Sequence, residues 1–210
     1  MYRRLFCFIT ISLVVLVLCS CSGDKNKPQG SPVNEKVAEL DETPDNALLV
    51  RLNGFRSDSI VVTLIPDNVK KSFCMTEAHQ AKMIKGSLTT GDTLSIFPEN
   101  KTKNVKICIN VSELRGRWFY DISQHRGFVF EQHGAMSSIN ADEICFKEWR
   151  LLNGKLNMFY IDMQQLIEGR SQYLVEEADM VSLTKEKLVF NFIGRNYICQ
   201  RQHGVIKFGE

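Results

Sequence analysis

The chain has 210 residues, of which 44% are hydrophobic and 24% are charged, so its composition is that of a globular protein. It carries 26 Lys and Arg against 24 Asp and Glu. Arg3 and Arg4 lie in a segment that we expect to be removed, which leaves 24 positive and 24 negative side chains. Such a balance excludes the broad basic field of a general nucleic-acid binder, and we expect no nucleic-acid partner.

The first residues have the pattern of a bacterial export signal. Arg3 and Arg4 precede an apolar run, Leu5 to Cys19, that is too short to span a bilayer. The end of this run, Leu18-Cys19-Ser20-Cys21, resembles a lipobox. The resemblance implies that residues 1–20 are a signal peptide cleaved after Ser20, and that Cys21 receives acyl chains such as palmitate and anchors the protein to the membrane. A plain signal peptide or an uncleaved anchor is the alternative.

The residues after Cys21 bear on location and reach. Ser22 differs from the Asp that favours inner-membrane retention, so we expect attachment to the outer membrane, with the periplasmic and the surface face both open. Residues 21–46 are polar and contain Pro28, Pro32 and Pro44. Such a segment cannot bury a core, and we expect a lipid-anchored, disordered tether.

Residues 47–111 predict a small β-domain. Short apolar runs with a period of two alternate with turn signals. The turn signal Thr89–Asp92 predicts a hairpin, because glycine tolerates the positive φ that such turns need. For Thr76–Met83, a helical turn is the alternative to a strand. The strands expected are Leu48–Leu52, Ser59–Ile65, Ala81–Leu88, Asp92–Phe97 and Val105–Val111.

Residues 112–210 differ in composition and predict a second domain. Residues 116–210 hold fourteen of the twenty aromatic residues, whereas residues 22–115 hold three. Alternating apolar pairs such as Phe128/Phe130 and Leu156/Met158 recur between turn signals, which indicates an antiparallel barrel or sandwich. Asn153-Gly154 is the strongest hairpin signal in the chain. The fold class expected for the whole chain is therefore all-β.

The second domain resembles a known family. Gly116-Arg117-Trp118 is similar to the Gly-x-Trp that opens lipocalin barrels, where the Trp fills the closed end. The segments that follow are similar, in this order, to lipocalin-like lipoproteins of Gram-negative gut anaerobes over about residues 114–202: Gly127–Phe130, Gly134–Asn140, Phe146–Trp149, Leu152–Leu156 and Val181–Phe190. The resemblance implies a lipocalin-like β-barrel. Asp162–Ile167 departs from the Ser-x-Gly-Asn-Gly pattern of other members, so ligand preference is not carried over.

The barrel interior has two interpretations. Its aromatic residues either line a cavity for a small apolar ligand or fill the barrel, as both occur in eight-stranded barrels. The residues expected in the pocket or the barrel core are Trp118, Phe128, Phe130, Trp149, Leu156 and Met158. Two functions follow: a non-catalytic envelope lipoprotein that binds a small apolar ligand, or a packed β-module that contacts a protein partner in the envelope.

Motifs for catalysis and metal binding are missing from the sequence. Cys-x-x-Cys, His-Glu-x-x-His, Gly-x-Ser-x-Gly and phosphate-binding glycine loops do not occur, so we expect no enzyme activity, no metal site and no cofactor. Beside Cys21 the mature chain holds Cys74, Cys108, Cys145 and Cys199, which form disulfides in an oxidising envelope or remain buried thiols.

Two tripeptides resemble the Asp-Ser/Thr-apolar sequon for O-glycosylation of envelope proteins in the same bacteria. They are Asp58-Ser59-Ile60 and Asp92-Thr93-Leu94. The resemblance implies that Ser59 and Thr93 are acceptors. An ordinary turn followed by a strand explains the same residues.

Overall fold

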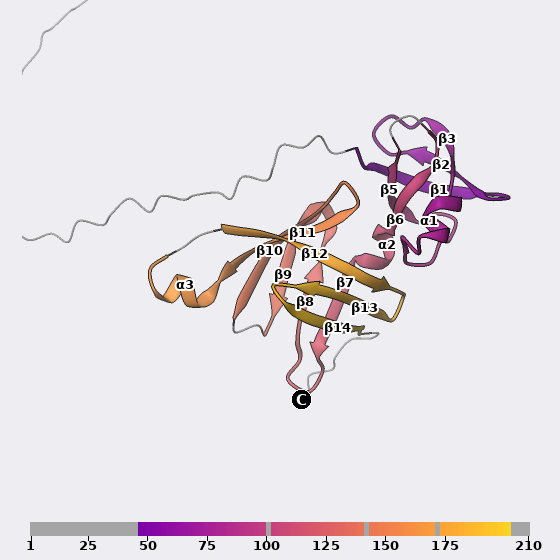
Figure 1. The fold of residues 1–210 in the computed structure, drawn as a ribbon. Helices are drawn as coiled ribbons and strands as arrows, with labels where there is room; N and C mark the ends of the chain where they lie inside the picture. Colours follow the sequence, from indigo (N-terminus) through magenta and orange to yellow (C-terminus); the bar gives the residue numbers. More distant parts are fainter. Residues whose placement is uncertain (1–45, 100–101, 141–142, 171–172, 203–210) are drawn as a thin grey trace, which may run out of the picture. The chain divides into compact units, whose positions relative to one another are not determined.

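A computed structural model describes residues 46–99, 102–140, 143–170 and 173–202 (Figure 1). The predicted signal peptide, the Cys21 anchor and all but the last residue of the predicted tether lie outside the described residues. Two sheets of six and eight strands, almost entirely antiparallel, dominate the described part. The all-β fold expected from the sequence is therefore confirmed.

The first sheet has the strand order β3-β2-β1-β5-β6-β4. Its pairs are antiparallel except β4 with β6. A hydrophobic cluster that includes Val50, Ile60 and Ile96 covers one face, and Ala78 of the short helix α1 packs into it. The elements are β1 (Leu48–Arg56), β2 (Ser59–Leu64), β3 (Lys70–Cys74), α1 (Thr76–Gln80), β4 (Ile84–Lys85), β5 (Thr93–Pro98) and β6 (Val105–Asn110).

Two sequence predictions in this sheet are wrong. The strand expected over Ala81–Leu88 reduces to β4, because Lys82 and Gly86 take positive φ and bend the chain on either side of it. The segment Thr89–Asp92 turns the chain, but β5 pairs with β1 and β6 and not with the preceding segment. The turn is stabilised by Asn110, whose amide donates to Asp92 Oδ2 at 2.8 Å. Strand β3 was not predicted.

The second sheet has the strand order β10-β11-β12-β13-β14-β7-β8-β9 and curves into a nearly closed antiparallel barrel. A bridge between Ala135 and Glu148 joins its two edges. Asn153 and Gly154 form the predicted hairpin turn between β10 and β11, both with positive φ. The elements are α2 (Val111–Leu114), β7 (Gly116–Asp121), β8 (Arg126–Phe130), the 3₁₀ turn η1 (Gln132–Gly134), β9 (Met136–Ile139), β10 (Ile144–Leu152), β11 (Lys155–Asp162), α3 (Met163–Ile167), β12 (Tyr173–Leu183), β13 (Lys187–Phe192) and β14 (Arg195–Arg201).

The helices α2 and α3 were missed by the sequence analysis, although each begins with a recognisable cap. The Asn110 side chain accepts a hydrogen bond from Glu113 N at 3.0 Å, and Asp162 accepts from Gln164 N at 2.9 Å. The patterns Asn-x-x-Glu and Asp-x-x-Gln are those of a capping box. Helix α3 occupies the Asp162–Ile167 segment that departs from the family pattern.

Aromatic rings fill the barrel. Phe128 lies at their centre, with its ring centroid 5.3 Å from that of Phe130 and 5.7 Å from those of Phe146 and Phe190. Edge-to-face contacts of this kind stabilise a core beyond the area they bury. All four rings are at most 3% exposed. Of the two interpretations of the interior, the packed one describes this region.

One end of the barrel is closed by Trp118. Its Nε1 donates to the carbonyl oxygen of Leu114 at 2.8 Å, and the Arg201 guanidinium lies over its ring at 4.3 Å from the centroid. Arg201 also donates to the carbonyl oxygens of Lys185 (2.7 Å), Arg115 (2.9 Å) and Glu113. The guanidinium therefore ties β14 to the turn before β13 and to the end of α2.

The four described cysteines are free thiols. Cys108 and Cys199 are fully buried in the two hydrophobic clusters, and burial raises the pKa of each thiol to about 12. A neutral thiol in such a place behaves as a small apolar side chain. Cys74 and Cys145 are half-buried. The structure thus contains buried and half-buried thiols in place of the disulfide alternative.

Candidate functional site

The end of the barrel opposite Trp118 carries a pocket of about 340 Å³, which we call the barrel-mouth pocket. It opens where β7 and β14, paired only through Phe119–Gln200 and Trp118–Arg201, diverge. Residues from β7, β8, β10 and β14 meet there. The lining residues are Tyr120, Arg126, Glu143, Ile144, Phe146, Arg195, Asn196, Tyr197 and Ile198.

Aromatic side chains form the base of the barrel-mouth pocket. Tyr120 and Tyr197 meet edge to face with centroids 5.4 Å apart, and Tyr197 stacks on the buried Phe190 at 5.1 Å. These contacts hold both tyrosines against the packed interior. Burial raises the pKa of Tyr197, so its hydroxyl stays protonated near neutral pH. The base is therefore rigid, largely apolar and equipped with hydroxyl groups.

Charged residues form the rim of the barrel-mouth pocket. Arg195, at the start of β14, pairs with Glu143, which directly precedes β10. The hydrogen bond with Glu143 raises the pKa of Arg195, so the guanidinium keeps its charge. Arg126 adds a second guanidinium. Asp121, which lies opposite Arg126 in the β7–β8 register, interacts with that guanidinium, so each arginine of the rim has a carboxylate beside it.

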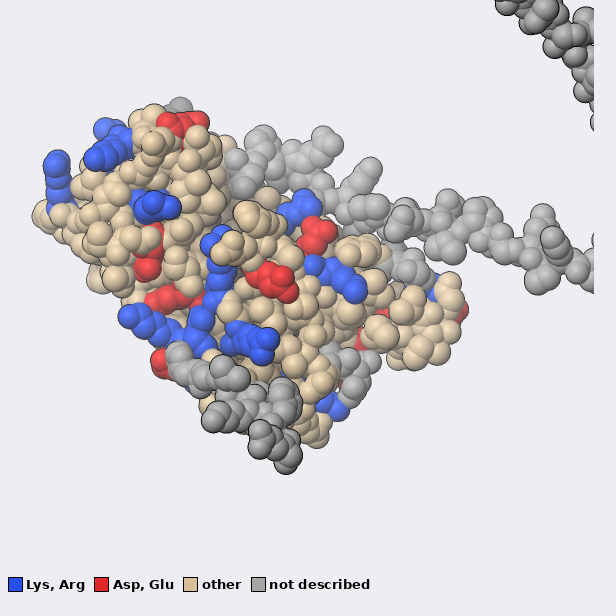
Figure 2. Space-filling view, turned by 180° about the vertical axis from the view of Figure 1, so that it is seen from behind, with Lys and Arg blue, Asp and Glu red and all other residues tan. Residues whose placement is uncertain are grey.

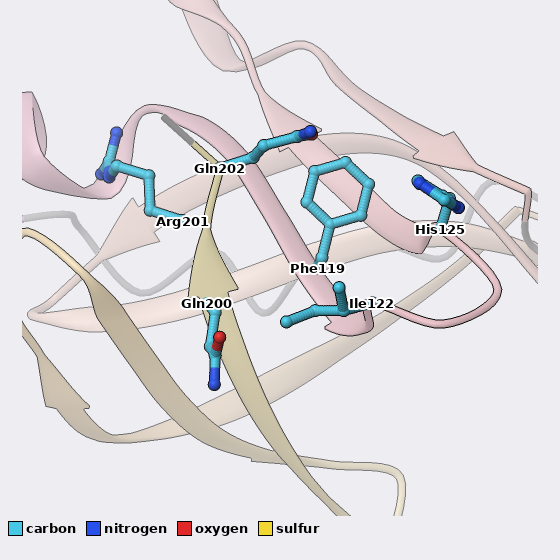
Figure 3. A pocket seen from close by; sticks show the side chains of 6 residues that line it. All are labelled: Phe119, Ile122, His125, Gln200, Arg201 and Gln202. Carbon is cyan, nitrogen blue, oxygen red and sulfur yellow. The ribbon is translucent and has the colours of Figure 1, made fainter. Parts of the chain in front are cut away.

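A smaller hollow of about 220 Å³ lies on the outer side of the same two strands (Figure 3). The Phe119 ring lies between Gln202 and the imidazole of His125, whereas the Arg201 side chain extends away from them. Its aromatic lining is the single ring of Phe119. The barrel-mouth pocket is larger and combines several rings with charged groups, so it is the stronger candidate for a ligand site.

The six residues expected in the pocket or the core all lie in the hydrophobic cluster of the barrel, each at most 5% exposed. None of the six lines the barrel-mouth pocket or the smaller hollow. The residues missed at the barrel mouth had a partial signal, because Tyr120 and Tyr197 lie two positions from the inward-facing Trp118 and Cys199 and share their faces. Charged rim residues carry no such periodicity.

The two predicted glycosylation acceptors lie at the starts of strands in the first sheet. Ser59 opens β2 and donates its hydroxyl to Asp58 Oδ1 at 3.2 Å. Thr93 opens β5, and its backbone N donates to Ser112 Oγ at 2.9 Å. Both are half-buried. Their modification stays a prediction.

On the face in Figure 2, basic and acidic side chains are interspersed among uncharged ones. Within the described ranges, no three His, Cys, Asp or Glu side chains gather as a metal site would require. The helices of this part are all too short or too polar to cross a membrane.

Comparisons with known proteins show a similarity for the barrel. Residues 110–200 match the model of the family described as lipocalin-like. A solved lipocalin-like protein from Bacteroides thetaiotaomicron is 23% identical, with 42% of this chain and 95% of that chain covered and a TM-score of 0.36. The comparison with curated proteins finds no match. Over residues 110–200, which include most of the barrel, the chain is thus similar to the lipocalin-like family.

Proposed function

We propose that the protein is a non-catalytic binding protein, and that its barrel-mouth pocket holds a small, largely apolar molecule with one anionic group. The observation that carries this proposal is the combination of stacked rings at the base with the Arg195–Glu143 pair at the rim. Small-molecule sites are typically apolar hollows with few, well-placed polar groups. The similarity of residues 110–200 to the lipocalin-like family supports a binding role.

The chemistry of the lining selects the ligand class. The rings of Tyr120, Phe146 and Tyr197 offer contact to a flat or aliphatic body. Arg195 and Arg126 both line the pocket, and a guanidinium group pairs with a carboxylate or sulfonate better than with an amine. Because Phe128 and Phe146 fill the space beneath, the ligand lies at the mouth and not along the barrel axis.

A binding experiment on the full-length protein tests this proposal. The isoleucine methyl groups are labelled with ¹³C, and the Ile144 methyl reports on the barrel-mouth pocket while that of Ile60 reports on the other sheet. The probes are 2-naphthoate and its neutral analogue 2-naphthalenemethanol. We expect both to shift the Ile144 signal, with the anion bound more tightly.

A substitution at the rim tests whether the affinity for the probe depends on its charge or on its shape. Arg195→Gln removes a positive charge and leaves Glu143, so we expect naphthoate to bind about fivefold more weakly and the alcohol to bind unchanged. Arg150→Gln is the matched control, because Arg150 forms a similar exposed pair with Glu148 away from the pocket. If neither probe moves the Ile144 signal, the binding role is wrong and the packed interaction module for an envelope partner replaces it.

We further propose that the mature protein is a lipoprotein attached to the outer membrane through Cys21, with residues 22–45 as the tether. The lipobox-like Leu18–Cys21 segment supports this proposal. The intact mass of the protein from its own membranes should equal that of residues 21–210 plus acyl chains. Cys21→Ser should abolish both the mass increase and membrane attachment, and a mass that retains residues 1–20 in the wild type would contradict the proposal.

A further inference from the structure

A second pocket, of about 360 Å³, lies on the six-stranded sheet, and we call it the Asp58 pocket. It lies between the tip of the β1–β2 hairpin, helix α1 and the segment around β4. Ile60 and Met75, which are 1% and 7% exposed, form its base together with Ile84 and Leu88. Phe55 lies on its rim and is 55% exposed. The pocket is thus an apolar hollow with an accessible aromatic ring.

One carboxylate gives the Asp58 pocket its charge. Among the eleven lining residues Asp58 is the only carboxylate, none is Lys or Arg, and His79 is the one histidine. Its oxygens accept hydrogen bonds from Ser59 Oγ (3.2 Å), Thr76 Oγ1 (3.3 Å) and Cys74 Sγ (3.5 Å). These bonds, that of Ser59 most of all, lower the pKa of Asp58. The group is therefore an anion at neutral pH, in a position that three side chains hold.

We infer that the Asp58 pocket binds a small organic amine, that is, an apolar body with one protonated nitrogen. The body packs on Met75 and Ile60, and the ammonium group donates to the Asp58 carboxylate. The exposed face of Phe55 offers a cation–π contact to the same group. The two pockets share no lining residue, and this ligand has the opposite charge to that proposed for the barrel-mouth pocket, so the two proposals can be tested separately.

The full-length protein labelled with ¹³C in its methionine methyl groups tests the inference. Met75 reports on the Asp58 pocket, whereas Met158 reports on the core of the barrel. The probes are 2-phenylethylamine and its neutral analogue 2-phenylethanol. We expect the amine to shift the Met75 signal saturably and to leave the Met158 signal in place. An amine that leaves Met75 unmoved, or that binds no more tightly than the alcohol, overturns the inference.

Two substitutions test the role of Asp58. Asp58→Asn keeps one of the two acceptor oxygens and removes the charge, so we expect about fivefold weaker amine binding and unchanged alcohol binding. Asp67→Asn, in the exposed β2–β3 turn outside the pocket, is the matched control. An equal effect of both variants means a general charge effect and overturns the inference.

A gain of charge keeps the test decisive even if Asp58→Asn fails to fold. Gln80, at the end of α1, also lines the pocket. Gln80→Glu adds a second carboxylate, so we expect the amine to bind two- to fivefold more tightly and the alcohol to bind as before. Unchanged or weaker amine binding contradicts the inference.

Discussion

Replacement of Trp118 by alanine should lower the free energy of unfolding by about 3–5 kcal/mol. The side chain is fully buried, so its removal leaves a large cavity at the closed end of the barrel. The Leu114 carbonyl also loses its indole donor, and Arg201 loses the ring on which it lies. Urea denaturation followed by far-ultraviolet circular dichroism measures the loss.

Two further variants identify the cause of the Trp118 effect. Trp118→Phe keeps a ring under Arg201 but cannot donate a hydrogen bond to the Leu114 carbonyl. Its free energy of unfolding should therefore lie between those of the wild type and the alanine variant. Val181→Ala, at a side chain 49% exposed on the same barrel, should change stability by less than about 0.5 kcal/mol. Equal effects of Trp118→Ala and Val181→Ala would show that the closed end contributes little to stability.

The second large effect is expected from Gly127→Ala. A Cβ atom at Gly127 would lie 2.1 Å from the Trp118 carbonyl oxygen and 3.0 Å from Phe119 Cα, both backbone atoms. The close approach occurs beside the irregularity that follows Phe119 in the β7–β8 pairing. The strands must move apart to admit the methyl group, and we expect a loss of about 3 kcal/mol or more. Thermal denaturation measures it.

Gly54→Ala is the matched control for Gly127→Ala. Gly54 also lies in a strand, but a Cβ atom there would meet nothing within 4 Å. We expect this variant to be neutral or slightly more stable, because alanine restricts the unfolded chain. A similar loss in both variants would assign the effect to glycine itself and not to the contact with Trp118.

The barrel could be predicted from the sequence because its strands alternate inward and outward residues. Pairs such as Phe128/Phe130 and Leu188/Phe190 face the interior as their spacing indicates, and Asn153-Gly154 supplies the positive φ of its hairpin turn. These are local signals. A period of two and a turn dipeptide predict a strand pair without knowledge of the rest of the chain.

The features that could not be predicted depend on contacts between residues far apart in the sequence. Strand β4 is two residues long and pairs in parallel with β6, so no local pattern indicates it. The Arg195–Glu143 pair joins positions 52 residues apart at the mouth of the barrel. The residues predicted for the pocket or the barrel core are large and apolar, and all six lie in the core. The barrel-mouth pocket is lined mainly by half-buried tyrosines and by charged residues near strand ends.

Because the interior of the barrel is filled, the residues that stabilise the fold are largely different from the residues that line the barrel-mouth pocket. Of the packed rings of Phe128, Phe130, Phe146 and Phe190, Phe146 alone lines the barrel-mouth pocket. Several other residues of that pocket lie at strand ends beside the loops. If the barrel-mouth pocket binds a ligand as proposed, substitutions at Arg126, Glu143 or Arg195 would alter its recognition at little expense to folding. Barrels of this kind would then diverge in ligand choice through these positions while the aromatic rings of the core stay constant.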